Sequence, residues 1–103
     1  MKTFKELGLS ESFSSNLEKM KIVVPTEIQE QAIPFLMKGE DVIGGSATGS
    51  GKTLAFGAPI IENLKPGEYV QALIMTPTRE LSEQVAESIE KFASKKLKIL
   101  PVY

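Results

Sequence analysis

A glycine-rich segment near the middle of the chain has the sequence Ser46-Ala47-Thr48-Gly49-Ser50-Gly51-Lys52-Thr53. The residues before it, 41–45, form a short apolar run that predicts a buried strand. The residues after it, from Lys52 to about Leu64, are apolar on most sides and predict a buried helix with Pro59 inside. A glycine-rich segment that ends in Gly-Lys-Thr between a strand and a helix predicts a phosphate-binding loop, or P-loop.

The chemistry of phosphate binding requires these residue types. Gly49 and Gly51 allow backbone angles and a close approach to a ligand that a Cβ atom would block. Amide groups at the start of the helix direct partial positive charge at phosphate oxygens. We expect Lys52 to reach the β- and γ-phosphates of a nucleotide and the Thr53 hydroxyl to bind Mg²⁺. Ser46 stands where the general pattern has glycine, so an ordinary Gly/Ser turn is the alternative.

Three further helices are predicted from capping residues and from apolar spacing. In the second of them, Gln29 stands three residues after the capping Thr26 and completes a capping box, and Gly39 ends the helix. The expected ranges are from Ser10 to about Met20, from Thr26 to Gly39 and from Thr78 to about Ala93.

Two more apolar runs, residues 71–76 and 97–102, predict strands. They alternate with the helices, which indicates right-handed βαβ units and a parallel sheet. The expected fold class is therefore α/β, with parallel strands and flanking helices.

The composition is that of one small globular domain of 103 residues, 42% hydrophobic and 24% charged. There are 12 basic and 13 acidic residues, so net charge alone does not indicate nucleic acid or an anionic membrane. The lack of cysteine and histidine excludes disulfides, thiolate nucleophiles and zinc sites built from these residues. No apolar run approaches the roughly 20 residues that span a bilayer, so we expect no membrane partner and a cytoplasmic location.

Two flanking segments decide which kind of P-loop protein this is. Pro25-Thr26-Glu27-Ile28-Gln29 precedes the P-loop, and Pro77-Thr78-Arg79-Glu80-Leu81 follows it. Together with residues 46–53, they resemble the Q motif, motif I and motif Ia of the DEAD-box RNA helicases, in the family's order. The resemblance extends from Phe4 to Tyr103. It implies that residues 1–103 are the N-terminal part of the first RecA-like P-loop NTPase domain of such a helicase.

The resemblance implies a site for ATP, or ADP, and Mg²⁺. Gln29 would hydrogen-bond the edges of adenine, Phe4 would stack on the adenine ring, and Thr26 would support the P-loop. The phosphates and Mg²⁺ would be bound by Thr48, Gly49, Ser50, Gly51, Lys52 and Thr53, of which Lys52 and Thr53 would take part in catalysis.

Motif Ia implies a contact of Pro77, Thr78 and Arg79 with single-stranded or duplex RNA through its phosphate backbone. Such contacts position a strand without reading its sequence. Arg79 and Glu80 could instead be solvated residues in the first turn of a helix. A basic cluster near the end of the chain is interpreted as a solvated face; its members are Lys91, Lys95, Lys96 and Lys98.

The nucleotide contacts have structural alternatives too. Gln29 could serve only as the reciprocal half of the capping box. Phe4 could be a core aromatic that pins the N-terminus. Lys21 and Ile22 stand where the family usually has glycine and an aromatic residue, which leaves open the geometry of the loop before Thr26.

The sequence contains no Asp-Glu-Ala-Asp segment, with which the family holds Mg²⁺ and activates water. We therefore expect an ATP-binding helicase segment that binds nucleotide weakly and does not hydrolyse ATP by itself. In the family, the strands between those at Val42 and Ala72 come from later sequence, so we expect open sheet edges and self-association through them. The alternatives are a non-catalytic nucleotide- or RNA-binding module and a different P-loop enzyme, such as a kinase or GTPase.

Overall fold

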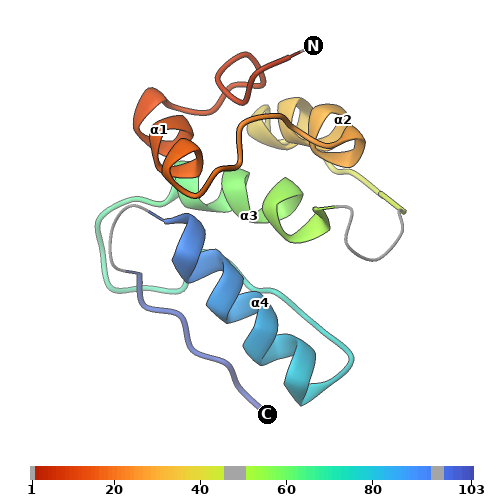
Figure 1. Cartoon of the computed structure of the whole chain (residues 1–103). Coiled ribbons are helices and arrows are strands. Elements are labelled where there is room, and N and C mark those ends of the chain that lie inside the picture. Colours follow the sequence, from red (N-terminus) through yellow and green to blue (C-terminus); the bar gives the residue numbers. More distant parts are fainter. Residues whose placement is uncertain (1, 46–50, 94–96) are drawn as a thin grey trace.

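Four α-helices make up the regular structure of the residues that the computed structural model describes, which are 2–45, 51–93 and 97–103 (Figure 1). They are α1 (Glu11–Lys19), α2 (Glu27–Met37), α3 (Lys52–Asn63) and α4 (Arg79–Phe92). All four lie where the sequence predicted helices. None of these described helices is long and apolar enough to cross a membrane.

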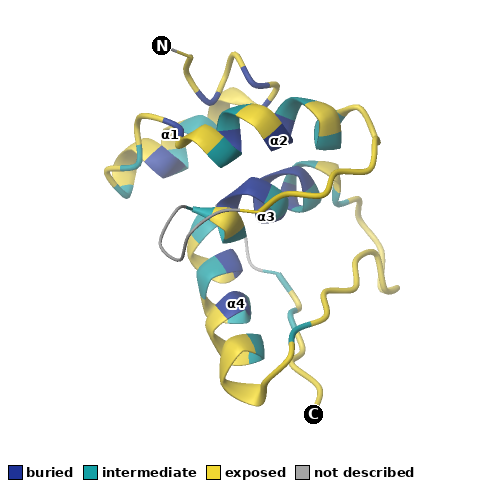
Figure 2. Ribbon diagram, turned by 90° about the vertical axis from the view of Figure 1, so that its right-hand side faces the viewer, coloured by how far each residue is buried: buried dark blue, intermediate teal, exposed yellow. Residues whose placement is uncertain are grey.

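Helix α3 lies at the centre of the molecule. It packs against both α2 and α4, and Figure 2 shows the buried side of α3 between the other helices. Helix α1 also contacts α4. The sequence explains the position of α3, because a helix that is apolar on most sides must be covered on most sides. Close packing on α4 uses Gly57, where an added Cβ atom would lie 3.4 Å from Cγ1 of Ile89. The core consists of Phe4, Leu7, Leu9, Phe13, Leu17, Ile33, Leu54, Ala58, Ile61, Val85 and Ile89.

Helix α2 ends at a glycine, as predicted. The N–H of Gly39 donates to the carbonyl oxygen of Leu36 at 3.0 Å, and the N–H of Glu40 donates to that of Phe35 at 3.0 Å. This pair of bonds is the Schellman motif. It requires the left-handed conformation at Gly39, whose φ is 82° and which glycine adopts without a steric penalty.

Helix α1 ends in the same motif, but a lysine holds the left-handed position. The N–H of Lys21 donates to the carbonyl oxygen of Glu18 at 2.9 Å, and the N–H of Ile22 donates to that of Leu17 at 2.8 Å. Lys21 has a φ of 64°. The glycine that the family resemblance places here would adopt this conformation freely. The loop before α2 therefore keeps the glycine-type geometry in spite of the lysine, at a cost in backbone strain.

The Lys21→Gly chain is expected to be more stable than the unchanged chain, with a free energy of unfolding higher by about 0.5–1 kcal/mol. The reason is that a left-handed conformation costs a residue with a Cβ atom more than it costs glycine. Urea denaturation followed by circular dichroism measures the difference. Lys21→Ala is the control, since it shortens the side chain but keeps the Cβ atom. An equal gain in both variants would assign the effect to the long side chain instead of the backbone.

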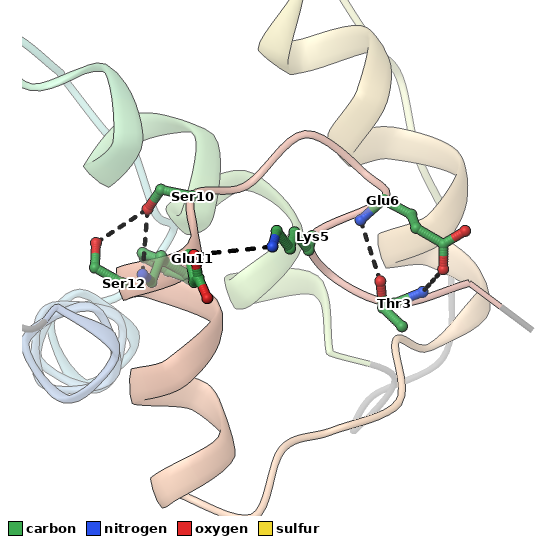
Figure 3. A network of polar contacts seen from close by, with 7 residues as sticks. Thr3, Lys5, Glu6, Ser10, Glu11 and Ser12 are labelled. Carbon is green, nitrogen blue, oxygen red and sulfur yellow. Dashed lines mark hydrogen bonds and ion pairs between the residues drawn. The ribbon is translucent and has the colours of Figure 1, made fainter.

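A turn before α1 carries Phe4 into the core. The N–H of Thr3 donates to Oε1 of Glu6 at 2.9 Å, and the N–H of Glu6 donates to Oγ1 of Thr3 at 3.2 Å (Figure 3). The hydrogen bond from the Thr3 backbone, aided by the Thr3 hydroxyl, lowers the pKa of Glu6 below its ordinary value. An ion pair of 3.8 Å between Lys5 and Glu11 connects the turn to α1. These contacts hold Phe4 in place, and only 3% of it is exposed.

The three predicted strands do not form in the described part of the chain, so the parallel-strand part of the fold prediction is not confirmed. Residues 41–45, 71–76 and 97–102 have no strand pairing, and many of their large apolar side chains are exposed. A strand needs a neighbour that satisfies its N–H and C=O groups, and none of these segments pairs with another. The open sheet edges expected from such strands are therefore not present in the described residues, and self-association stays a prediction.

Candidate functional site

Gln29 connects the start of α2 to the start of α3. Its Oε1 accepts a hydrogen bond from the N–H of Thr26 at 2.8 Å, and its Nε2 donates to the carbonyl oxygen of Gly51 at 3.2 Å. The side chain is buried, with 3% of the residue exposed. The capping interaction predicted for Gln29 is thus confirmed, and the same amide joins the two predicted motifs. Its contact with adenine stays a prediction.

Gly51 can only be glycine in this arrangement. Its φ of 88° lies in the left-handed region. An added Cβ atom would lie 2.3 Å from Nε2 of Gln29 and 3.2 Å from Oγ1 of Thr26. Gly51 is the N-cap of α3 and offers no side-chain cap to the helix. The first N–H groups of a helix have no partner within it, so they are available to an external acceptor.

Lys52 and Thr53 follow in the first turn of α3, which places a cation and a hydroxyl beside these N–H groups. Lys52 is exposed and Thr53 is half-buried. A helix N-terminus with a lysine is suited to phosphate, and a hydroxyl oxygen is a suitable ligand for Mg²⁺. The described residues hold no group of three Asp or Glu that could bind a metal by themselves. Three of the predicted phosphate ligands, Thr48, Gly49 and Ser50, lie outside the described residues.

Phe4 is a core residue in this structure, as the alternative interpretation proposed. It packs in one cluster with Leu7, Leu9 and Phe13. With 3% of the residue exposed, its ring offers no free face to a ligand unless the N-terminal turn moves. The stacking of Phe4 on adenine therefore stays a prediction that requires such a movement.

The second group of predicted site residues lies together at the start of α4. Pro77, Thr78 and Arg79 are all exposed. Thr78 is the N-cap, and its Oγ1 accepts a hydrogen bond from the N–H of Leu81 at 3.1 Å. The carbonyl oxygen of Thr78 accepts a hydrogen bond from the hydroxyl of Thr76 at 3.1 Å. This well-capped helix start presents an arginine at its first position, which suits a phosphate group.

Two residues that the sequence analysis did not identify also lie at the start of α4. The guanidinium carbon of Arg79 lies 4.7 Å from the ring centroid of Tyr103. The hydroxyl of Tyr103 donates to Oε1 of Glu83 at 2.7 Å, and this hydrogen bond raises the pKa of Tyr103 above its ordinary value. A signal existed in the sequence. Two parallel strands at 71–76 and 97–102 would end at the same sheet edge, which would bring Tyr103 to Arg79.

Two lysines of the basic cluster, Lys91 and Lys98, lie among the described residues. Lys91 is in the last turn of α4, and Lys98 forms an ion pair of 3.3 Å with Glu68. Both lysines are exposed, which agrees with a solvated face. Lys95 and Lys96 lie outside the described residues.

The arrangement around Gly51 is that of a P-loop nucleotide-binding domain. A helix begins with glycine, lysine and threonine, and a buried glutamine from the preceding capped helix holds the glycine. The chain matches the model of the DEAD/DEAH box helicase family over residues 26–103. It belongs to this family, and the prediction made from the three motifs is confirmed.

Individual relatives agree with this assignment. The RNA helicase CrhR of Synechocystis sp. is 47% identical over 102 residues, which are 98% of this chain and 21% of CrhR. A DEAD box protein from the hyperthermophile Methanococcus jannaschii gives a TM-score of 0.85 at 39% identity, over 93% of this chain and 27% of that one. S. cerevisiae Dbp5 bound to RNA and ADP BeF3 gives a TM-score of 0.82 at 34% identity, over 89% of this chain and 24% of Dbp5. The fold is therefore RecA-like, and the chain spans about a fifth of CrhR.

Proposed function

We propose that residues 1–103 are the N-terminal part of the first RecA-like domain of an ATP-dependent RNA helicase, and that they bind ATP and part of the RNA. The contact between Gln29 and Gly51 carries this proposal. The two residues belong to motifs that are 22 positions apart in sequence, and they meet at the start of α3. Family membership supports the same function, as does the similarity to Dbp5 bound to RNA and ADP BeF3.

In the nucleotide site, the start of α3 would bind the phosphates through its N–H groups and through the ammonium of Lys52. Thr53 would hold Mg²⁺, which lowers the repulsion between phosphate oxygens when it is bound. Gln29 would select adenine through the hydrogen-bonding capacity of its amide that Thr26 and Gly51 leave free. The sequence contains no Asp-Glu-Ala-Asp segment with which the family activates water, so the proposal for these 103 residues is binding without hydrolysis.

In the RNA site, Pro77, Thr78 and Arg79 would contact the phosphate backbone. The partial positive charge at the start of α4 and the guanidinium of Arg79 both favour a phosphate. In the whole protein, ATP binding and hydrolysis would then be coupled to the unwinding or remodelling of RNA.

Residues 71–76 and 97–102 would pair as parallel strands in the complete domain. Their exposed apolar side chains, among them Leu73, Met75 and Leu100, need a cover that the described residues do not supply. The contact of Arg79 with Tyr103 supports this pairing, since it joins the two ends that a parallel arrangement brings to one edge.

The unchanged chain is expected to bind ADP about ten times more tightly than GDP, and Gln29→Glu is expected to remove most of this preference. Glutamate keeps the oxygen that caps α2 but loses the Nε2 donor. The negative charge of glutamate weakens the binding of ADP and GDP alike. The ratio of the two dissociation constants is therefore the quantity to measure. Titration with fluorescent ADP and GDP gives both constants.

Circular dichroism of the Gln29→Glu chain provides the control that α2 is still formed. If the unchanged chain bound ADP and GDP equally, or if the preference survived the substitution, Gln29 would not be the adenine-selecting residue. A preference for GDP would exclude adenine selection by this site.

A further inference from the structure

Three side chains form a connected group near the start of α4: Arg79 of motif Ia, and Glu83 and Tyr103, which lie outside the motifs. The ring of Tyr103 lies under the guanidinium of Arg79, at 4.7 Å from ring centroid to Cζ. The hydroxyl of Tyr103 is fixed by its hydrogen bond of 2.7 Å to Glu83. Glu83 follows Arg79 by one helical turn, so both residues lie on the same side of α4.

This group restrains an arginine that would otherwise be free. Arg79 is exposed, and no described carboxylate lies within ion-pair distance of it. A guanidinium over an aromatic ring is attracted by the ring electrons and loses part of its freedom to rotate. The flat face of the guanidinium is then covered, while its N–H groups at the edge remain able to donate to a phosphate.

The hydrogen bond to Glu83 has a second effect. Arginine and glutamate four residues apart on a helix tend to form a direct ion pair. Here Glu83 accepts a hydrogen bond from Tyr103 instead. The carboxylate therefore anchors the ring and does not draw the guanidinium away from the start of the helix.

We propose that Tyr103 is a positioning residue: its ring, anchored on Glu83, holds the Arg79 guanidinium in place for an RNA phosphate. This inference rests on the proposed RNA contact of Arg79. It assigns a role to a residue outside motif Ia, and it predicts that Tyr103 acts on RNA only through Arg79.

A double-mutant cycle with four chains tests the proposal: unchanged, Tyr103→Ala, Arg79→Ala and the combined variant. The probe is a fluorescently labelled oligouridylate, and its dissociation constant is measured by anisotropy at one fixed salt concentration. We expect Arg79→Ala to weaken binding about tenfold. We expect Tyr103→Ala to weaken it about two- to fivefold. In the Arg79→Ala background, Tyr103→Ala is expected to cause no further loss.

Two further measurements separate positioning from a general structural effect. Tyr103→Phe keeps the ring and the cation–π contact, so its loss of RNA affinity should be at most about half of the loss in Tyr103→Ala. The Nε–Hε resonance of Arg79 in the free chain should shift in Tyr103→Ala, where the ring current is lost, and less in Tyr103→Phe. Because 67% of Tyr103 is exposed, the unfolding midpoint should stay the same in both variants.

The outcomes distinguish this inference from the proposed function. If Arg79→Ala weakens RNA binding and Tyr103→Ala does not, the positioning role is wrong while the RNA contact stands. An equal loss from Tyr103→Ala with and without Arg79 would mean that the ring contacts RNA directly, which also overturns the positioning role. If Arg79→Ala has no effect, the proposed RNA contact itself fails and the inference fails with it.

Discussion

The Lys52→Ala chain is expected to bind ADP about ten to a hundred times more weakly than the unchanged chain, because a charge-assisted hydrogen bond contributes about 1.5–3 kcal/mol. Lys52 is exposed at the first position of α3, so its side chain is free to meet a phosphate. Alanine is the best helix former, and the substitution should leave α3 intact. Titration with fluorescent ADP in the presence of Mg²⁺ measures the loss.

Lys19→Ala is the matched control for this substitution. Lys19 is also an exposed lysine in a terminal turn of a helix, but it lies in the last turn of α1. The Lys19→Ala substitution removes one positive charge from the chain, as Lys52→Ala does. Equal losses of ADP affinity in the two variants would show that only the net charge matters. An undiminished affinity in Lys52→Ala would exclude the start of α3 as the phosphate site.

The helices could be predicted from the sequence because their ends are encoded locally. Ser10 and Thr26 each stand at the N-cap of a helix in the structure, as predicted. Thr78, where another helix was expected to begin, is also an N-cap. The chain reversal at Gly39 follows from glycine alone. The end of α1 shows the limit of this approach, because Lys21 adopts the glycine conformation without being glycine. There the packing of Ile22 against the core accompanies the turn and helps to hold a backbone conformation that Lys21 alone would disfavour.

The strands could not be predicted in the same way, because a strand is completed by its neighbour. The apolar run at residues 71–76 predicts a segment to be covered, but it does not say which segment covers it. In the described residues no segment does, and Leu73 and Met75 remain exposed at 82% and 86%. In the interior of a helix, by contrast, the N–H and C=O groups pair within the same segment, so the local sequence is enough to predict it.

For the site, the sequence predicted the residues but not their contacts. Gln29 and Gly51 were each identified within a motif, while the hydrogen bond between them follows from the packing of α2 on α3. For Phe4, the sequence suggested an environment that the structure does not have. Its place in the sequence indicated a ligand contact, and the reciprocal bonds between Thr3 and Glu6 instead hold a turn that directs it into the core.

The contact between Gln29 and Gly51 predicts that a substitution of Gly51 lowers both stability and ADP affinity, whereas a substitution of Gly39 lowers stability alone. Gly51→Ala is expected to lower the free energy of unfolding by about 2–3 kcal/mol, of which about 1–2 come from the left-handed conformation and about 1 from the lost hydrogen bond. Gly39 has a similar φ, 82° against 88°, but an added Cβ atom there would meet nothing within 4 Å. Gly39→Ala should therefore cost only the conformational part. Urea denaturation of the two variants measures the difference.

The affinity for ADP should distinguish the Gly51→Ala and Gly39→Ala chains further. A Cβ atom at Gly51 would displace the Gln29 amide, since the two would lie 2.3 Å apart. The end of a glutamine side chain can move, so the chain can still fold, but the amide then leaves the position from which it holds the start of α3. At a temperature where both variants are folded, Gly51→Ala should weaken ADP binding about tenfold and Gly39→Ala should not change it. A Gly51→Ala chain with unchanged ADP affinity would mean that Gln29 can leave Gly51 without consequence for the phosphate site, and the coupling between the two motifs would then be structural alone.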